Sequence, residues 1–457
     1  MPVCIKNKEK IFFIFLLGLL VSEISAQESG SLYYLPEVSQ WSLDNPAMQN
    51  HTDKLVVGMP FLSGVSWQWN SSVPINALFS KGFAYSFHRF YDTLDEQGKI
   101  QTSAGATVFF ASFRHQNYTF SLSVSERAFS EGIFDREIVR IIRDGTKDFY
   151  GKNEYLGEAS MFLTHYREIA PGVSKRLHKD LDVGVRAKLL FGKLHFSGED
   201  MSFAVEADQE NLLIQTEGNF IFGGALRHQR DTIRKSSTFY ADISPGNYFF
   251  QPRNLGVALD LGVVYRPNKF SELSLSFTDA GLLGFRHKTF ESVFSRPVIY
   301  SEKDFYQSVD EGVTEPRYLE PRQALIKFGD SLAYVLDVNK TNTRNFSTLP
   351  FKIGLAGKYR FSDKLTAGFQ NQFKTYQLNA LNLFSLFATA KLHPRFTFYG
   401  SLSLLNTENI FPGFGASYTN NWLQIYFTSN NISGIIQPMA TKQLNLSFGI
   451  NFLFETQ

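Results

Sequence analysis

Apolar and polar residues alternate along most of the chain, most clearly in its last stretch. From Leu444 to Phe454 every second residue is apolar, and the residues between them are mostly small or polar. Side chains on a β-strand point to opposite faces in turn, so this stretch predicts a strand with one wholly apolar face. It is about twice as long as an ordinary strand and meets the roughly 9–11 residues that a tilted transmembrane strand needs. We therefore expect the closing strand of a membrane-spanning barrel rather than a strand of a soluble sheet.

Pairs of such stretches are separated by short polar segments that predict six tight turns. These turns lie near residues 116, 179, 268, 362, 393 and 420. Six turns join twelve strands, and a first strand over Lys54–Trp69 and the closing strand complete a set of about fourteen. Single-chain bacterial barrels have an even number of strands, short periplasmic turns and longer outer loops. The pattern predicts an all-β fold, one transmembrane antiparallel barrel with short helices in its loops. A short β-like run at Phe83–Phe90 leaves sixteen strands as an alternative.

Other stretches interrupt the alternation and predict the loops. Isoleucines at helical spacing predict a helix within Phe134–Arg143, and a second apolar periodicity predicts a helix beginning near Pro321. Ser197–Asn254 and Gly281–Pro350 are the longest interruptions, and we expect both to lie outside the barrel wall. A small hairpin is expected around Asp208–Asn211.

The beginning of the sequence has the pattern of a secretory signal peptide. Three lysines precede the apolar run Ile11–Val21, and Ala26 offers a small residue for cleavage. The run is too short for a membrane helix of about 20 residues. We expect a signal peptide over 1–26, an N-terminal segment over 27–53 and a barrel over 54–457. The only cysteine, Cys4, lies in the part expected to be removed, so disulfides and thiol chemistry are not expected in the mature chain.

Composition supports a β-rich envelope protein and excludes several other classes. The 457 residues include 46 Phe and 20 Tyr, which favour strands, and the net charge of +2 favours neither disorder nor a nucleic-acid partner. The sequence has no phosphate-binding loop and no nucleophile elbow, and its histidines do not have the spacing of metal ligands. We therefore expect no enzyme activity, no cofactor and no metal site.

Six residues are candidates for the interior of the barrel. Lys188, Lys352, Lys358 and Lys374 fall on the inward parity of their strands, away from the tight turns. Over the clearest strands, eight inward cations stand against two carboxylates, and a wall lined by one sign of charge enriches the opposite ion. Asp44 and Asn45 are candidates for an N-terminal plug in the lumen, with an ordinary turn as the alternative. Asn45 precedes a proline, which favours a turn or extended conformation.

Several motifs resemble an uncharacterised family of Bacteroidota outer-membrane proteins, a domain of unknown function. The opening residues Asp44-Asn-Pro-Ala47 and Lys54-Leu-Val-Val-Gly-Met-Pro60 carry part of the likeness. The other matching stretches are Tyr166–Glu168, Leu181–Gly192, Asn254–Gly262, Ser274–Gly284 and Leu423–Ile432. The chain departs from the family pattern at Gly284-Phe285 and at Ser429-Asn430. The resemblance implies a fold similar to fourteen-strand long-chain fatty-acid transporters and to barrels associated with type IX secretion, and a place in the outer membrane. It implies no catalytic or binding residues.

Two functional hypotheses follow. The first is passage or binding of a small or apolar solute through a partly plugged lumen. The alternative is a non-conducting partner or anchor in a secretion or surface-protein complex. The expected partners are outer-membrane lipid and lipopolysaccharide, together with an envelope protein in the second case. The basic run Arg227–Lys235 could meet lipopolysaccharide phosphates, or it could be a solvated loop.

Overall fold

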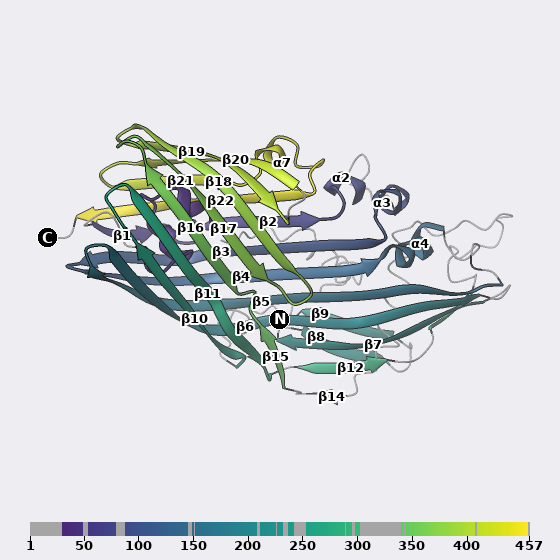
Figure 1. Ribbon diagram of the computed structural model, residues 1–457. Helices are drawn as coiled ribbons and strands as arrows, with labels where there is room; N and C mark the ends of the chain where they lie inside the picture. The colour runs from purple at the N-terminus through teal and green to yellow at the C-terminus, as the bar shows by residue number, and fades with distance from the viewer. Residues whose placement is uncertain are drawn as a thin grey trace.

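The computed structural model of the protein describes residues 30–48, 54–78, 87–144, 149, 151–207, 211–224, 226–231, 236–241, 253–287, 289–294, 298–301, 340–341, 344–406 and 409–455. Its strands form a closed antiparallel barrel of fourteen strands (Figure 1). The wall consists, in order, of β1 (Lys54–Gly58) with β2 (Val65–Ser71), β3 (Gln97–His115), β4 (Tyr118–Asp135), β5 (Asn153–His178), β6 (Leu181–Ala207), β10 (Leu255–Tyr265), β11 (Ser271–Phe285), β16 (Lys352–Arg360), β17 (Leu365–Thr375), β18 (Ala380–His393), β19 (Phe396–Leu405), β20 (Asn409–Thr419), β21 (Leu423–Ser429) and β22 (Gln443–Glu455).

The predicted tight turns and the predicted closure of the barrel are confirmed. Short turns join β3 to β4, β5 to β6, β10 to β11, β16 to β17, β18 to β19 and β20 to β21. The closing strand β22 pairs with both β1 and β2, as in Leu55↔Phe454 and Val65↔Phe448. All six turns are at one end of the barrel, and the longer connections leave from the other end.

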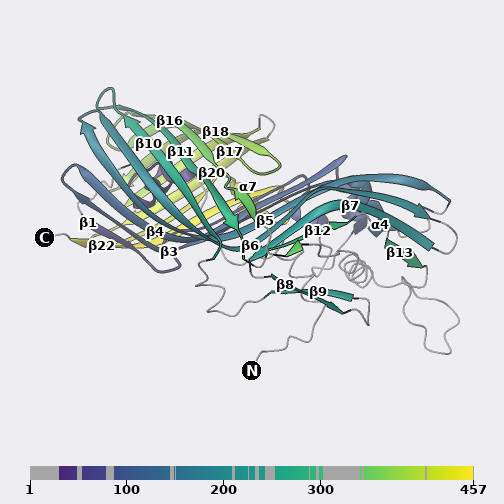
Figure 2. The ribbon, with the colours of Figure 1, turned by 90° about the horizontal axis from the view of Figure 1, so that it is seen from below.

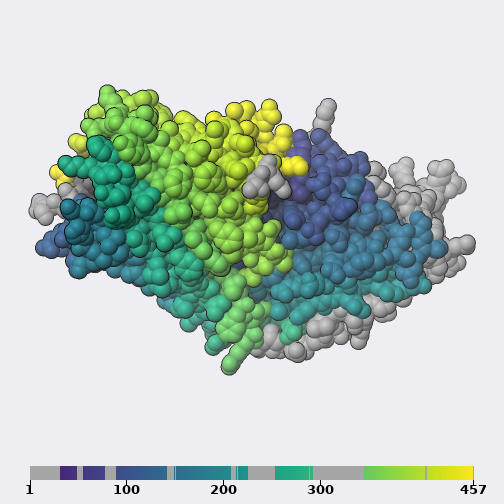
Figure 3. Space-filling view, viewed as in Figure 1, coloured from purple at the N-terminus to yellow at the C-terminus, as the bar shows by residue number. Residues whose placement is uncertain are grey.

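The outer and inner faces of the wall follow the predicted alternation. Along β10, exposed and buried residues alternate without interruption. The outward apolar side chains of this strand include Val257, which is 65 % exposed, and Leu261, which is 46 % exposed. On β22, the inward Ser447 and Asn451 are buried. In the space-filling view, the green and yellow strands form a continuous surface on the side facing the viewer (Figure 3).

The prediction of a strand at Phe83–Phe90 was wrong for the part that the structure describes. Residues 87–90 belong to the helix α3 (Phe87–Thr93), and residues 83–86 lie outside the described residues. Phe90, Tyr91 and Leu94 are buried at helical spacing, and they pack beside α2 (Ile75–Leu78). The first strand also differs from its prediction, because residues 59–64 interrupt it. Pro60 lies in this break, and proline cannot donate a ladder hydrogen bond.

The strands β5 and β6 extend beyond the barrel and carry an outer sheet (Figures 1 and 2). β7 (Asn211–Gly224) pairs with the far half of β6, and β12 (Phe290–Phe294) and β13 (Val298–Ser301) pair with β7. The stretch Ser197–Asn254, predicted as a loop with a small hairpin, therefore contains the end of β6 and all of β7. The hairpin predicted around Asp208–Asn211 is confirmed, because Ala207 of β6 pairs with Leu212 of β7.

The remaining described elements are short. They are the 3₁₀ helices η1 (Gly30–Tyr34) and η2 (Ser39–Leu43), the helices α4 (Arg136–Asp144) and α7 (Ile432–Ile436), and the strands β8 (Leu226–Asp231), β9 (Ser236–Ala241), β14 (Lys340–Thr341) and β15 (Asn345–Thr348). α4 confirms the helix predicted within Phe134–Arg143. β8 contains the first part of the basic run Arg227–Lys235, and the helix predicted near Pro321 lies outside the described residues. Among the described helices, none has the length and apolar character to cross a membrane.

Candidate functional site

The lumen of the barrel is occupied at the short-turn end by residues 30–48, which we call the lumen segment. The side chains of Leu32, Tyr34 and Trp41 are at most 1 % exposed, and they pack against inward aromatic residues of the wall. The ring of Tyr34 stacks on Phe387 of β18 with 4.3 Å between centroids, and it meets Tyr399 of β19 edge-on at 5.0 Å. Two short 3₁₀ helices thus supply an apolar core inside a wall whose inner face is otherwise largely polar.

Polar contacts fix the lumen segment to several wall strands. The Ser31 hydroxyl donates to Thr428 Oγ1 on β21 at 2.9 Å, and Gln424 Nε2 on the same strand donates to the Glu37 carbonyl at 2.7 Å. Thr389 Oγ1 on β18 donates to the Tyr34 carbonyl at 2.8 Å. In the other direction, Gln40 Nε2 of the segment donates to the Ser63 carbonyl at 2.9 Å. A buried backbone carbonyl needs a partner, and here side chains of the barrel provide one.

The structure places the plug candidates Asp44 and Asn45 at the end of η2, against the inner wall. Asn45 Oδ1 accepts from the Ala47 amide at 2.9 Å, which closes a local turn, and Asn45 Nδ2 donates to the Leu275 carbonyl of β11 at 3.2 Å. The wall residues beneath this turn are Gly184 of β6 and Gly262 of β10, which are register partners. A Cβ at Gly184 would lie 2.2 Å from the Pro46 carbonyl oxygen, so the turn fits only over glycine.

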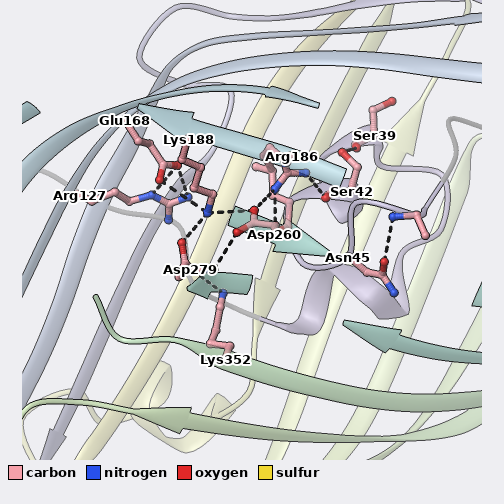
Figure 4. Close-up of polar contacts among 12 residues, drawn as sticks. Ser39, Ser42, Asn45, Arg127, Glu168, Arg186, Lys188, Asp260, Asp279 and Lys352 are labelled. Atoms are coloured by element: carbon pink, nitrogen blue, oxygen red, sulfur yellow. Dashed lines mark hydrogen bonds and ion pairs between the residues drawn. The ribbon is translucent and has the colours of Figure 1, made fainter. Parts of the chain in front are cut away.

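Beside the lumen segment, seven charged residues from the wall form an ion cluster (Figure 4). Lys188 is at its centre, with its ammonium 3.0 Å from Asp260 Oδ2, 3.8 Å from Glu168 Oε2 and in direct contact with Asp279. The other members are Arg127, Arg186 and Lys352. Buried charges are stable only when they are paired, and this cluster pairs four cations with three carboxylates.

Arg186 links this ion cluster to the lumen segment. One guanidinium nitrogen lies 3.1 Å from Asp260 Oδ2 and also donates to the Leu43 carbonyl at 3.2 Å. The other terminal nitrogen donates to the Ser42 carbonyl. The side chain is 2 % exposed, so its charge is balanced by protein groups and not by bulk solvent. The position of the lumen segment is therefore coupled to the charges of β6 and β10.

The lumen lysines predicted from the sequence are separated by the structure. Lys188 and Lys352 belong to the ion cluster, whereas Lys358 Nζ lies 2.7 Å from Glu272 Oε1. The Lys374 ammonium lies over the ring of Tyr376, 4.3 Å from its centroid. The sequence count of inward charges left out Glu168, Glu272 and Asp279, and these carboxylates pair with the lysines that were expected to set the sign of the lumen.

A β-bulge explains why strand parity missed Asp279. The pairing of β10 with β11 shifts register between Leu259 and Leu261. Asp279 has a positive φ of 63°, and its amide donates to Asp260 Oδ1 at 2.7 Å. A bulge inserts an extra residue and re-aims the side chain. Asp279 therefore faces the lumen although the alternation alone would place it outside.

Above the lumen segment, the barrel contains two adjoining cavities. The inner pocket, of about 70 Å³, is lined by residues of β2, β16–β20 and β22 and includes Lys352 and Lys374. It adjoins a larger cavity of about 1090 Å³, the outer vestibule, lined by the strand ends and long connections around Asp95–Gln97, Asn406 and Lys442. Asn70, Leu381, Leu405, Phe411, Asn431 and Gln443 line both cavities. The interior is thus hollow from the long-connection end down to Lys352, which also belongs to the ion cluster.

Burial raises the pKa of three groups of the lumen segment, the phenols of Tyr33 and Tyr34 and the carboxyl of Asp44. Burial raises the pKa of the Asp44 carboxyl from 3.8 to about 6, although the nearby charges of Lys352, Arg127 and Arg186 act in the opposite direction. Oδ2 of Asp44 has no hydrogen-bond partner among the described residues. In the same described ranges, no group of three or more His, Cys, Asp or Glu residues is arranged to hold a metal ion.

Comparison with known proteins gives structural likenesses and a family. A Pseudomonas aeruginosa FadL homologue is similar with a TM-score of 0.42 and 10 % identity, covering 92 % of this chain and 94 % of that one. The Pseudomonas putida toluene transporter TodX is similar with a TM-score of 0.38 and 8 % identity, covering 94 % and 95 %. Likeness at this level carries no argument about function. No curated protein matches the sequence. The model of a family of unknown function, DUF5723, matches residues 46–430, and the chain belongs to that family.

Proposed function

We propose that the protein is an integral barrel of the bacterial outer membrane. The support is the outer face of the wall, where exposed large apolar side chains of β10, β11, β16, β18 and β19 are 37–71 % exposed. Soluble monomers rarely expose apolar patches larger than a few hundred Å². Outer-membrane barrels carry such a band around the whole wall, with short turns on the periplasmic side. Lipid and lipopolysaccharide are then its immediate surroundings, with the outer sheet facing away from the cell.

We further propose that the barrel binds a small solute from outside and lets it pass when the lumen segment moves. The observation that carries this proposal is the order of parts along the barrel axis. An outer vestibule leads to an inner pocket, and beneath the pocket the lumen segment fills the interior. Ligand sites are concave, with apolar surface and a few placed polar groups, and the inner pocket has both. We propose no chemical step for this site.

Removal of residues 27–53 tests the proposed passage. The purified barrel and the deletion variant are reconstituted into planar lipid bilayers, and single-channel currents are recorded. We expect the intact barrel to be closed for most of the time and the deletion variant to conduct steadily. Gly400→Ala is a control, because a Cβ at Gly400 meets nothing within 4 Å. A deletion variant that folds but does not conduct would contradict passage through the lumen.

An anchor in an envelope complex is the second candidate, and one observation favours it. β5 and β6, of 26 and 27 residues, carry the outer sheet well beyond the barrel (Figure 2). A transmembrane strand needs only about 9–11 residues, so the extension serves something outside the wall. Affinity purification from envelope membranes tests this alternative. A partner recovered in stoichiometric amount, together with a non-conducting deletion variant, would favour the anchor.

A further inference from the structure

Three arginines lie side by side at the long-connection end of β10, β11 and β15 (Figure 1). The register of β10 with β11, continued past the ends of the strands, brings Arg253 beside Arg286. The register of β11 with β15 brings Arg286 beside Arg344, one step beyond the pair Phe285↔Asn345. All three side chains are exposed. We call Arg253, Arg286 and Arg344 the arginine row.

The arginine row lies on the outer face of the wall. Residues two apart along a strand share a face. Arg253 comes two residues before Leu255, and Arg344 comes two residues before Phe346, and these two apolar side chains are 52 % and 57 % exposed. The guanidinium carbon of Arg286 lies 5.9 Å from the centroid of the Phe346 ring, so this charge is on the same face.

Hydrogen bonds hold the ends of β10 and β11 together beneath the arginine row. Asn254 is 1 % exposed, and its Oδ1 accepts from the amides of Arg286 and His287, each at 2.9 Å. On the surface, Arg253 Nη1 lies 3.2 Å from His287 Nε2. Two of the three arginines are therefore positioned by the wall itself, which lowers the entropy cost of binding a ligand.

The charge of the arginine row is not balanced by the protein. Within the parts of the chain that the structure describes, none of the three guanidinium groups forms an ion pair with a carboxylate. Their ring contacts, with His287 and Phe346, bring no negative charge. Arg127 and Arg186 inside the barrel differ, because each is paired with a carboxylate. Like charges side by side on a sheet repel each other, and an anion that reaches all three would remove this repulsion.

The surface next to the arginine row, toward the short turns, is apolar. Leu255, Val257, Leu282 and Phe346 point outward there and are 51–65 % exposed. β10 has 11 residues, the length with which a tilted strand crosses a membrane once. Its first residue is then at one boundary of the apolar band. In the proposed membrane, with the short turns on the periplasmic side, the arginine row lies at the level of the outer headgroups.

We propose that the arginine row binds the phosphate groups of lipopolysaccharide in the outer leaflet, and that the acyl chains of this lipid lie on the apolar side chains beside it. Guanidinium groups match phosphate oxygens with paired hydrogen bonds. Basic residues beside a membrane-spanning segment attract anionic headgroups. Free phosphate would use the arginines alone, and a neutral lipid would use the apolar side chains alone. The proposal rests on the proposed membrane location and deepens it by naming the lipid and the residues that bind it.

Competition for bound lipid A tests the proposal. The full barrel is held on an affinity resin in dodecyl maltoside, and bound radiolabelled, bisphosphorylated lipid A is displaced by the same lipid A, by lipid A without its phosphates, or by inorganic phosphate. We expect intact lipid A to compete about tenfold or more strongly than the other two probes, since each lacks one kind of contact. Its affinity should fall as salt is raised to about 0.5 M. Equal competition by dephosphorylated lipid A, or by inorganic phosphate, would overturn the proposal.

Matched variants separate this site from general charge. The first variant removes the arginine row, as Arg253→Gln/Arg286→Gln/Arg344→Gln. The control removes three exposed charges from short turns, as Lys179→Gln/Lys269→Gln/Lys364→Gln. We expect the first variant to bind lipid A about tenfold or more weakly and the control to bind it like the natural protein. Equal loss in both variants, or no loss in the first, would overturn the site. Heat-modifiable migration in gels shows that each variant is folded.

The result is distinguishable from a failure of the proposed membrane location. That location is tested separately by the cost of Leu261→Arg in the middle of β10 against Leu392→Arg beside a short turn. Equal costs, with lipid A bound through the arginine row, would leave the phosphate site standing and remove the membrane boundary. Unequal costs, with dephosphorylated lipid A bound as tightly as intact lipid A, would leave the membrane location standing and remove the site.

Discussion

Gly184 of β6 and Gly262 of β10 lie directly opposite each other in the wall, and together they form the notch that receives the turn of the lumen segment. A Cβ at Gly262 would lie 2.0 Å from Asn45 Oδ1, and one at Gly184 would lie 2.2 Å from the Pro46 carbonyl oxygen. Neither glycine has a positive φ, so backbone conformation does not require glycine at these positions. What requires it is the close approach of the lumen segment to the wall. The seating of the lumen segment therefore depends on two missing side chains on neighbouring strands.

Gly184→Ala should release the lumen segment while the barrel stays folded. The added methyl group meets backbone atoms of Pro46 and Ala47, which cannot move aside cheaply, and overpacking of this kind costs about 1–3 kcal/mol. Hydrogen exchange followed by mass spectrometry should show faster exchange in residues 30–48. Gly400→Ala, at an open position, should behave like the natural protein. Unchanged exchange in Gly184→Ala would show that the notch does not hold the segment.

The pH dependence of docking should follow Asp44. Its pKa is about 6 in the docked state and is expected to return to about 3.8 when the segment is released. A raised pKa means that the docked state binds the proton more tightly, so docking is most favourable below pH 4 and weakens as the pH rises through about 6. After division by the intrinsic amide exchange rate at each pH, the protection of residues 30–48 should accordingly be greater at pH 4.5 than at pH 7. Asp44→Asn should remove this difference, and a variant that keeps it would point to another group.

If the barrel lies in a membrane, a charge on its outer face should lower the free energy of unfolding more when it lies deeper in the bilayer. Leu261→Arg places a guanidinium near the middle of β10, where the cost is about 2–4 kcal/mol, and Leu392→Arg places one beside a short turn, where it is about 0–1 kcal/mol. Both leucines are exposed in the structure. Unfolding by urea in lipid vesicles gives the two free energies. Equal costs would contradict the membrane boundary that we infer from the wall.

The barrel wall could be predicted from the sequence because its signal is local. In Leu255–Tyr265, apolar residues at every second position define the strand and its outward face, and the turn that follows is short. The outer sheet could not be predicted in this way. Beyond Phe196, the pairing of β6 with β7 shifts register between Glu199 and Ser202, so these stretches keep no single alternation. The helix at Phe87–Thr93 was also misread, because a run of aromatic residues is compatible with a strand when its spacing is ignored.

The interior could be predicted only in part. Parity assigned Lys188 and Lys352 to the inner side, and in the structure both belong to the ion cluster. It could not show which carboxylates they meet, because Glu168, Asp260 and Lys188 lie on different strands and come together only when β5, β6 and β10 pair in register. Asp279 escaped the count because a bulge reverses its direction. The sign and number of inward charges therefore predict the electrostatics of the lumen less well than the charged groups on neighbouring strands do.

A reversible disulfide between the lumen segment and the wall tests the central claim most directly. Cys4 is the only native cysteine, and Ser31 Oγ lies 2.9 Å from Thr428 Oγ1, so Ser31→Cys/Thr428→Cys offers a single, buried crosslink. The measurement is uptake of a small solute, labelled glucose, into liposomes that contain the variant, before and after reduction, with each single-cysteine variant as a control. If the lumen segment must move for solute to pass, the oxidised form takes up no more than protein-free liposomes, and reduction restores uptake to the natural rate. Equal uptake by the oxidised and reduced forms, or uptake by neither, would contradict that claim.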